Sequence, residues 1–245
     1  MLYIIGLGLN ERSISKQALD ALNKCKRVYL ETYTVDFPYN KVQLEEQINK
    51  KIIEADREKI EGLSIVDEAA KLHVALLVYG SPLMATTHIT LIEEAKEMGV
   101  KYKIIQNASI FDAVAETGLQ FYKFGKTASM PAWNSAKSFE PTSFMEIVKQ
   151  NLSIDAHSLI LIDIGLDFPR TLKQLKRATK EYEIKLSKLV ICQALGTKKQ
   201  KIMYKSLGDL EEFDNVQKPY CIIIPSLKLH HVEKSFLEGF GMKKK

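Results

Sequence analysis

The first ten residues, "MLYIIGLGLN" (1–10), join an apolar run to two glycines one residue apart, and this stretch decides the fold class. The run from Leu2 to Ile5 is typical of a buried strand. Residues 13–25, "SISKQALDALNKC", have the spacing of an amphipathic helix that Ser13 or Ser15 would cap. A strand, a glycine turn and a helix in this order indicate the beginning of an α/β sheet.

The two glycines do not complete a phosphate-binding motif. A dinucleotide fingerprint needs a third glycine three residues after the second, and that position is Glu11 here. The chain also has no Gly-Lys-Ser or Gly-Lys-Thr of a P-loop. Two interpretations stay open at this point: a strand end where the backbone approaches a ligand closely, or a tight structural turn.

The strand–turn–helix pattern repeats along the N-terminal half and changes after Gly118. Strands are predicted at 26–34, 73–80 and 101–106, and a helix is predicted to begin at Thr86 or Thr87 and to end at Gly99. The C-terminal half is predicted to contain helices at 143–152, 170–184 and 230–240, strands at 158–165, 188–196 and 220–226, and a hairpin-like piece at 201–210. We therefore expect two α/β domains, residues 1–118 and 119–245.

Composition limits the classes of function. The formal net charge of +5 fits either an acidic partner or a basic surface without one. The three cysteines lie far apart, without a C-x-x-C pair, which argues against disulfides and a zinc–thiolate site. No metal-binding His motif, signal peptide or membrane-length apolar run is recognisable, so we expect no metal, no membrane association and a cytoplasmic protein.

Three loops have the same design, a buried strand followed by a polar turn and a helix. They surround Gly8, Ser81 and Ser109. Ligands of open α/β sheets bind at the carboxyl ends of the strands, so we expect these loops to converge on one crevice. His88 and Asp112 lie near these loops and are the candidates for a proton acceptor, although no catalytic residue can be assigned from the sequence.

Several stretches together resemble the diphthine synthases, a family of the tetrapyrrole methylase superfamily. The resemblance runs in order through nearly the whole chain: "LYIIGLGL", "RVYLETYT", "ADRE", "GSPLMATTH", "NASI", "GLQFYKFG", "SLILIDI", "QKI" and "PYCIIIPS". The N-terminal half is the more specific part, and "NASI" followed by "GLQFYKFG" is its most distinctive feature.

The resemblance implies a fold and an activity. The fold would be two α/β domains of the tetrapyrrole methylase type, with S-adenosylmethionine in the cleft between them and S-adenosylhomocysteine as product. The enzyme would successively methylate the amino group of the 3-amino-3-carboxypropyl-histidine of translation elongation factor 2, giving diphthine in diphthamide biosynthesis. It would be a homodimer that does not bind nucleic acid directly. The alternatives are a tetrapyrrole methyltransferase of the same superfamily and a catalytically silent relative.

The resemblance also implies which residues contact the cofactor. By motif they are Leu9, Ser81, Met84, Ser109, Ile110, Ile162, Leu195 and Tyr220. Two features depart from the family pattern: Ser81 stands where the family usually has aspartate, and the segment from Asp163 to Leu189 is short. Ser81 offers a neutral hydroxyl where an aspartate would offer a carboxylate, and this difference keeps the silent relative among the alternatives.

Overall fold

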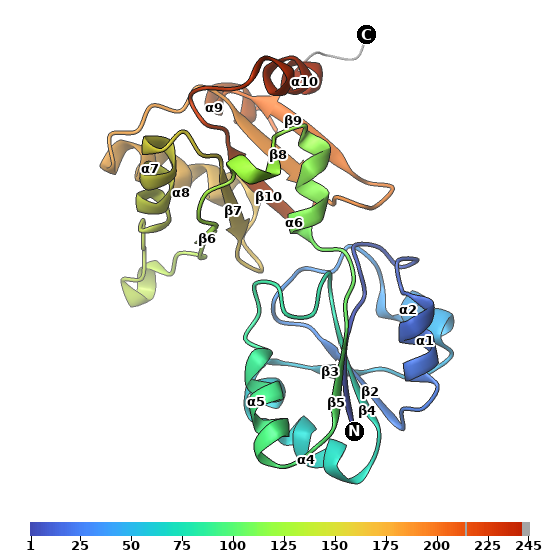
Figure 1. Cartoon of the computed structure of the whole chain (residues 1–245). Coiled ribbons are helices and arrows are strands. Elements are labelled where there is room, and N and C mark those ends of the chain that lie inside the picture. Colours follow the sequence, from blue (N-terminus) through green and yellow to red (C-terminus); the bar gives the residue numbers. More distant parts are fainter. Residues whose placement is uncertain (214, 242–245) are drawn as a thin grey trace. The chain divides into compact units, whose positions relative to one another are not determined.

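The computed structural model describes residues 1–213 and 215–241 and divides the chain into two compact units, Met1–Ala113 and Val114–Lys245 (Figure 1). Each unit is built on one five-stranded sheet with helices packed against it. The α/β class predicted from the alternating pattern is confirmed in both units.

The sheet of the N-terminal unit is entirely parallel, with the strand order β3-β2-β4-β1-β5. Its strands are Leu2–Gly6 (β1), Arg27–Glu31 (β2), Ile53–Ala55 (β3), Val74–Val78 (β4) and Tyr102–Ile105 (β5). Strands β1 and β4 are buried along their whole length and occupy the middle of the sheet, which explains why both are continuous apolar runs.

Helices cover both faces of this sheet, and β1 contributes to both cores. Leu2 and Ile4 pack with α3 (Arg57–Glu61), α4 (Ser64–Lys71) and α5 (Ile89–Glu97) on one face. Tyr3 and Ile5 pack with α1 (Lys16–Leu22) and α2 (Lys41–Ile48) on the other. This alternation follows from the two-residue repeat of a strand, and Figure 1 shows α1 and α2 on the opposite side of the sheet from α5.

The helix ends test the predicted capping residues. Ser15 caps α1 by accepting a hydrogen bond from the N–H of Ala18 (3.1 Å), as predicted. Gly99 follows α5 with a φ of +67°, also as predicted. The predicted cap of α5, Thr86 or Thr87, is wrong: the cap is His88, the next residue after Thr87, and its side chain makes no capping bond. Strand β3 and helix α3 were not predicted, because each spans five residues or fewer.

The second unit has a mixed sheet in the order β6-β7-β10-β8-β9. Strand β10 is antiparallel to both β7 and β8, and β8 and β9 form an antiparallel hairpin. The strands are Ala128–Met130 (β6), Ser158–Ile162 (β7), Leu189–Gln193 (β8), Lys201–Lys205 (β9) and Tyr220–Ile224 (β10).

The helices of the second unit pack around this sheet. They are Phe144–Ser153 (α7), Phe168–Glu181 (α8), Leu207–Leu210 (α9) and His231–Gly241 (α10), with short 3₁₀ turns at Val114–Thr117 (η1), Phe121–Lys123 (η2) and Ser135–Lys137 (η3). Helix α6 (Ile110–Ala113) is the last element of the N-terminal unit. The buried faces of α7 and α8 form one apolar core with the sheet, centred on Phe144, Phe168 and Ile222. No helix within residues 1–213 and 215–241 has the length and apolarity needed to cross a bilayer.

Candidate active site

The carboxyl ends of β1 and β4 are joined directly through their glycines. The N–H of Gly8 donates to the carbonyl of Gly80 (3.1 Å), and the N–H of Gly80 donates to the carbonyl of Gly8 (3.0 Å). Both residues have left-handed backbone conformations, with φ of +73° and +71°. A methyl group at Gly6 would lie 2.6 Å from the carbonyl oxygen of Gly80. The glycines of "GLGL" therefore serve the contact between two loops.

The third loop joins the first through Asn107. Its Nδ2 donates to the carbonyls of Gly6 (3.1 Å) and Ser13 (2.9 Å), and its Oδ1 accepts from the N–H of Ala108 (2.9 Å). Asn107 thus holds the strand end of β1 and the segment before α1 at fixed positions. The predicted convergence of the three loops within this unit is confirmed by these contacts.

The second loop is held to the third by a pair of side chains. The hydroxyl of Ser81 donates to Oε1 of Gln106 (2.9 Å), and Ser81 is buried. Met84, three residues further on, is 46% exposed, a large exposed fraction for an apolar side chain beside a row of glycine and serine residues. The loop therefore presents an anchored hydroxyl and an accessible thioether.

Ser109 and Asp112 organise the start of α6. The N–H and the hydroxyl of Ser109 both donate to Oδ2 of Asp112, at 2.6 and 2.9 Å. The carboxylate of Asp112 therefore stabilises the turn that carries Ser109. Ile110, the first residue of α6, is partly exposed beside this turn.

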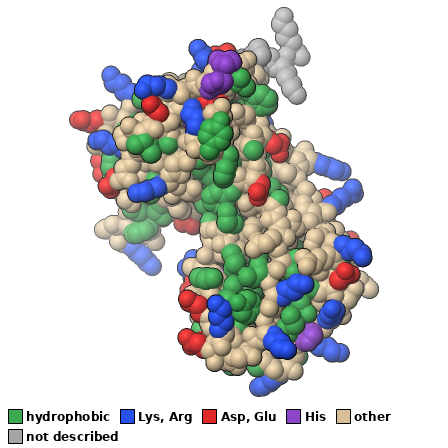
Figure 2. All heavy atoms as spheres, viewed as in Figure 1, with side chains coloured by type: hydrophobic (Ala, Val, Ile, Leu, Met, Phe, Trp, Pro, Cys, Tyr) green, Lys and Arg blue, Asp and Glu red, His purple; other side chains and the backbone are tan. Residues whose placement is uncertain are grey.

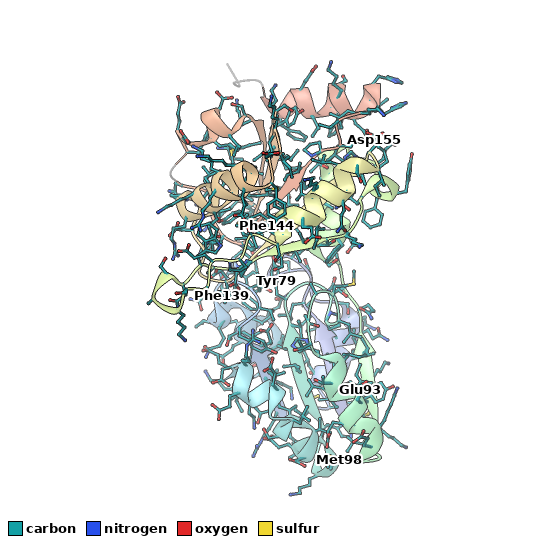
Figure 3. All side chains as sticks on the ribbon, turned by 90° about the vertical axis from the view of Figure 1, so that its left-hand side faces the viewer. Tyr79, Glu93, Met98, Phe139, Phe144 and Asp155 are labelled. Atoms are coloured by element: carbon teal, nitrogen blue, oxygen red, sulfur yellow. The ribbon has the colours of Figure 1, made fainter. Side chains whose placement is uncertain are left out.

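Leu9 is fixed by a residue that the sequence reasoning missed. The hydroxyl of Tyr79 donates to the carbonyl of Leu9 (3.0 Å), and the rings of Tyr79, Phe37 and Tyr39 pack against one another. Burial raises the pKa of Tyr79 well above its usual value, so it remains a donor at neutral pH. Figure 3 shows Tyr79 at the end of this unit opposite Met98, that is, at the carboxyl end of the strands. The only signal in the sequence was its place directly before Gly80.

His88 lies fully buried behind the second loop. Its Nδ1 is 3.0 Å from the carbonyl oxygen of Pro82, and because a carbonyl only accepts, Nδ1 carries the proton. Its Nε2 has no hydrogen-bond partner among the described residues. The imidazole ring therefore supports the backbone of the second loop from the interior of the unit. Because the ring is buried, it does not reach a substrate in this conformation.

The remaining three predicted residues gather at one end of the second sheet. Tyr220 begins β10 and is paired in register with Gln193, two residues before Leu195. On the other side of β10, Cys221 pairs with Leu161, which places Ile162 beside Tyr220. The hydroxyl of Tyr220 lies 2.7 Å from Oγ1 of Thr171. The structure thus brings Ile162, Leu195 and Tyr220 together within their own unit; their contact with a cofactor stays a prediction.

The three loops of the N-terminal unit offer an uncharged set of groups. Residues 6–9, 80–84 and 107–110 contain no Lys, Arg, Asp or Glu, and they present backbone groups, hydroxyls, one amide and apolar side chains. The set has no Lys or Arg that could form a charge-assisted bond to a phosphate, and a sulfonium cation is compatible with neutral, polarisable neighbours. Among the described residues, no group of three or more His, Cys, Asp and Glu is arranged to hold a metal ion.

Comparison with known proteins places the chain in a family. The model of the tetrapyrrole (corrin/porphyrin) methylases matches residues 1–211. The chain belongs to the tetrapyrrole methylase family. Within it, a diphthine methyl ester synthase from Emericella nidulans is 33% identical over 271 residues, covering 99% of this chain and 94% of the relative. A protein of the same name from Bos taurus is 43% identical over 186 residues, covering 75% of this chain and 64% of the relative.

Solved structures agree with the sequence relatives. The crystal structure of a diphthine synthase, 29% identical, superposes with a TM-score of 0.88 over 98% of this chain and 96% of the other. A structure from Entamoeba histolytica, 33% identical, superposes with a TM-score of 0.89 over 100% of this chain and 99% of the other. These relationships confirm the predicted tetrapyrrole methylase fold and the predicted S-adenosylmethionine-dependent methyltransferase of diphthamide biosynthesis.

Proposed function

We propose that this methyltransferase acts on the 3-amino-3-carboxypropyl-histidine of translation elongation factor 2 and methylates its amino group successively. The observation that carries the proposal is that nearly the whole chain is similar to proteins named diphthine synthase or diphthine methyl ester synthase. The uncharged residues 6–9, 80–84 and 107–110, which suit a sulfonium, support it. The same names favour this substrate over a tetrapyrrole. Since relatives such as that from Bos taurus are named methyl ester synthases, we extend the proposal to the carboxylate of the same chain.

The cofactor contacts are part of the proposal. Leu9, Ser81, Met84, Ser109 and Ile110 would hold S-adenosylmethionine from the N-terminal unit, and Ile162, Leu195 and Tyr220 from the second unit. When bound, the cofactor supplies a methyl group that is already activated by its positive sulfur. The loops then have three tasks: to bind, to orient the acceptor amine, and to exclude water.

The chain's own residues suit those tasks. Asn107, Gln106 and Tyr79 hold the three loops by hydrogen bonds, so the binding surface is organised before a ligand arrives. His88 supports the second loop from behind through the carbonyl of Pro82. Residues 6–9, 80–84 and 107–110 contain no charged side chain that would repel the sulfonium, and Ser81 keeps its hydroxyl engaged with Gln106. We further propose, on the resemblance, that the enzyme is a cytoplasmic homodimer.

The test is methyl transfer to the modified protein. The chain is incubated with labelled S-adenosylmethionine and elongation factor 2 that carries the unmethylated 3-amino-3-carboxypropyl-histidine, and the modified peptide is followed by mass spectrometry. Elongation factor 2 with unmodified histidine is the matched control. Mild alkali then separates the two kinds of product, because it removes a methyl ester and leaves methylated nitrogen intact. Cofactor binding without transfer would contradict the proposal and favour a silent relative.

A further inference from the structure

The second unit carries the net positive charge of the chain. It contains 21 of the 35 Lys and Arg residues but 14 of the 30 Asp and Glu residues, whereas the N-terminal unit has more acidic than basic residues. Figure 2 shows Lys and Arg side chains along the outer margin of this unit, with Asp and Glu side chains between them. This imbalance favours an acidic partner for the second unit.

A groove in this unit combines lysines with an apolar floor. It has a volume of about 620 Å³ and lies between the segment before β8, the end of β10 and α10. Apolar groups form its floor and wall: Leu152, Leu186, Tyr204, Ile224, Pro225, Leu227 and Leu229. The charged residues of the lining are four lysines and one acid: Lys185, Lys188, Lys228, Lys234 and Glu238. We call this the lysine groove.

The lysines of the groove differ in how they are engaged. Lys228 is paired with Asp155 (2.8 Å), and the ammonium of Lys188 lies 5.0 Å over the ring of Tyr204. Lys185 and Lys234 are exposed and form no ion pair with a described residue. The groove therefore has an excess of positive charge that its own carboxylate, Glu238, does not neutralise.

The loop that carries Leu227 is rigidly held, although Leu227 itself is 71% exposed. The N–H of Ser226 donates to Nδ1 of buried His157 (2.9 Å), and the ammonium of Lys123 donates to the carbonyl of Lys228 (3.1 Å). Both His157 and Lys123 are in turn bound to the buried carboxylate of Glu233, at 3.0 and 2.7 Å.

Leu227 is therefore a largely exposed leucine on a loop whose position is fixed by buried His157 and partly buried Lys123. Pre-organised apolar side chains beside a charged rim are typical of recognition surfaces. The lysine groove thus has the two parts of a protein-docking site, an apolar anchor point and a rim with an excess of positive charge.

We propose that the lysine groove docks an acidic segment of the elongation factor, apart from the modified histidine, with an apolar side chain of that segment against Leu227 and its carboxylates against Lys185, Lys188 and Lys234. This inference rests on the proposed function. An acidic peptide fits better than RNA, because the lining has no arginine and a single aromatic ring, whereas single-stranded nucleic acid needs several stacking surfaces.

The test is the steady-state kinetics of full-length protein with the modified elongation factor. The variant Lys185→Glu/Lys188→Glu/Lys234→Glu reverses the charge at three positions on the rim of the groove. The control Lys126→Glu/Lys137→Glu/Lys173→Glu changes the same net charge at exposed lysines of the same unit outside the groove. We expect the groove variant to raise KM for the elongation factor about tenfold with kcat and cofactor affinity unchanged, since reversed rim charges act on encounter and docking.

Two further measurements sharpen the test. KM of the wild type should rise with ionic strength, and KM of the groove variant should respond much less. Leu227→Ala should raise KM about threefold, and Val42→Ala, an exposed apolar residue of the other unit, should not.

Failure of the docking site and failure of the proposed function give different results. Equal KM values for groove and control variants, with an active wild type, overturn the docking site alone. A wild type that transfers no methyl group overturns the proposed function and the docking site with it. Poly-uridylate that binds the wild type but not the groove variant, while KM for the elongation factor is unchanged, assigns the groove to nucleic acid and also overturns the proposal.

Discussion

The buried carboxylate of Glu233 should be one of the largest single contributors to the stability of the second unit. Its side chain is fully buried and accepts hydrogen bonds from Lys123, from His157, and from the N–H groups of Gln120 (2.9 Å) and His230 (2.8 Å). Burial by itself would raise the pKa of Glu233, but these donors outweigh it and lower the pKa from 4.5 to about 2.

The size of the effect follows from this shift. Each pKa unit corresponds to about 1.4 kcal/mol, so ionised Glu233 contributes about 3 kcal/mol to the free energy of unfolding. Glu233→Gln removes the charge and leaves Lys123 without its counter-ion, and we expect a loss of about 3 kcal/mol at pH 7. Glu238→Gln, an exposed position on the same helix, should change the free energy of unfolding by less than about 0.5 kcal/mol.

The pH dependence supplies a second, independent readout. The folded-state pKa of Glu233 is lowered, so its contribution is complete above pH 4.5 and is lost as the pH falls from 4.5 towards 2. Burial also lowers the pKa of His157, so both proteins lose stability as the pH falls below 6.5, and Glu233→Gln loses more because the Glu233 carboxylate raises the His157 pKa in the wild type. The difference between wild type and Glu233→Gln should therefore be constant above about pH 7 and should shrink as the pH falls from 4.5 towards 2.

Urea unfolding followed by tryptophan fluorescence is the assay. Trp133 is the single tryptophan and lies in the second unit, so its signal reports on that unit alone. A difference of less than 0.5 kcal/mol at pH 7 would refute the reasoning. So would a difference that does not shrink as the pH falls from 4.5 to 3, because the stabilisation would then not depend on the ionised carboxylate.

The other predictions concern the N-terminal loops and the thiols. Gly8→Ala should destabilise the N-terminal unit by more than about 2 kcal/mol in urea unfolding, because its methyl group would lie 2.5 Å from Cβ of Ser13. Gly99→Ala is the control, since Gly99 has a similar φ but open space around it, and it should cost about 1 kcal/mol. Equal losses of stability in the two variants would contradict the loop contact. Asn107→Ala should weaken S-adenosylmethionine binding about tenfold by calorimetry, since two hydrogen bonds that hold the first loop are lost; unchanged affinity would remove these loops from the site. Burial raises the pKa of the Cys25 thiol to about 11, and a hydrogen bond with Cys221 together with burial raises the pKa of Cys192. Neither thiol should therefore react with Ellman's reagent at pH 8 before unfolding.

Much of the N-terminal fold could be predicted from local pattern. The apolar runs of β1 and β4 and the one-sided spacing of α1 record burial within single segments, and such patterns are visible in a sequence. The family could also be predicted, because its motifs are short contiguous stretches such as "NASI" and "GLQFYKFG". The predicted cap of α5 was wrong because a threonine hydroxyl is only one of several ways to begin a helix.

Sequence alone thus determined that alternating strands and helices form an α/β methyltransferase with polar loops at the strand ends. Only the tertiary structure decided what those residues contact. Gly8 meets Gly80, Asn107 meets Gly6, and Glu233 meets Lys123, each pair separated by 72 to 110 positions in the chain. Such contacts depend on how distant segments pair across a sheet or pack around it, and the local periodicity of a sequence does not encode that pairing.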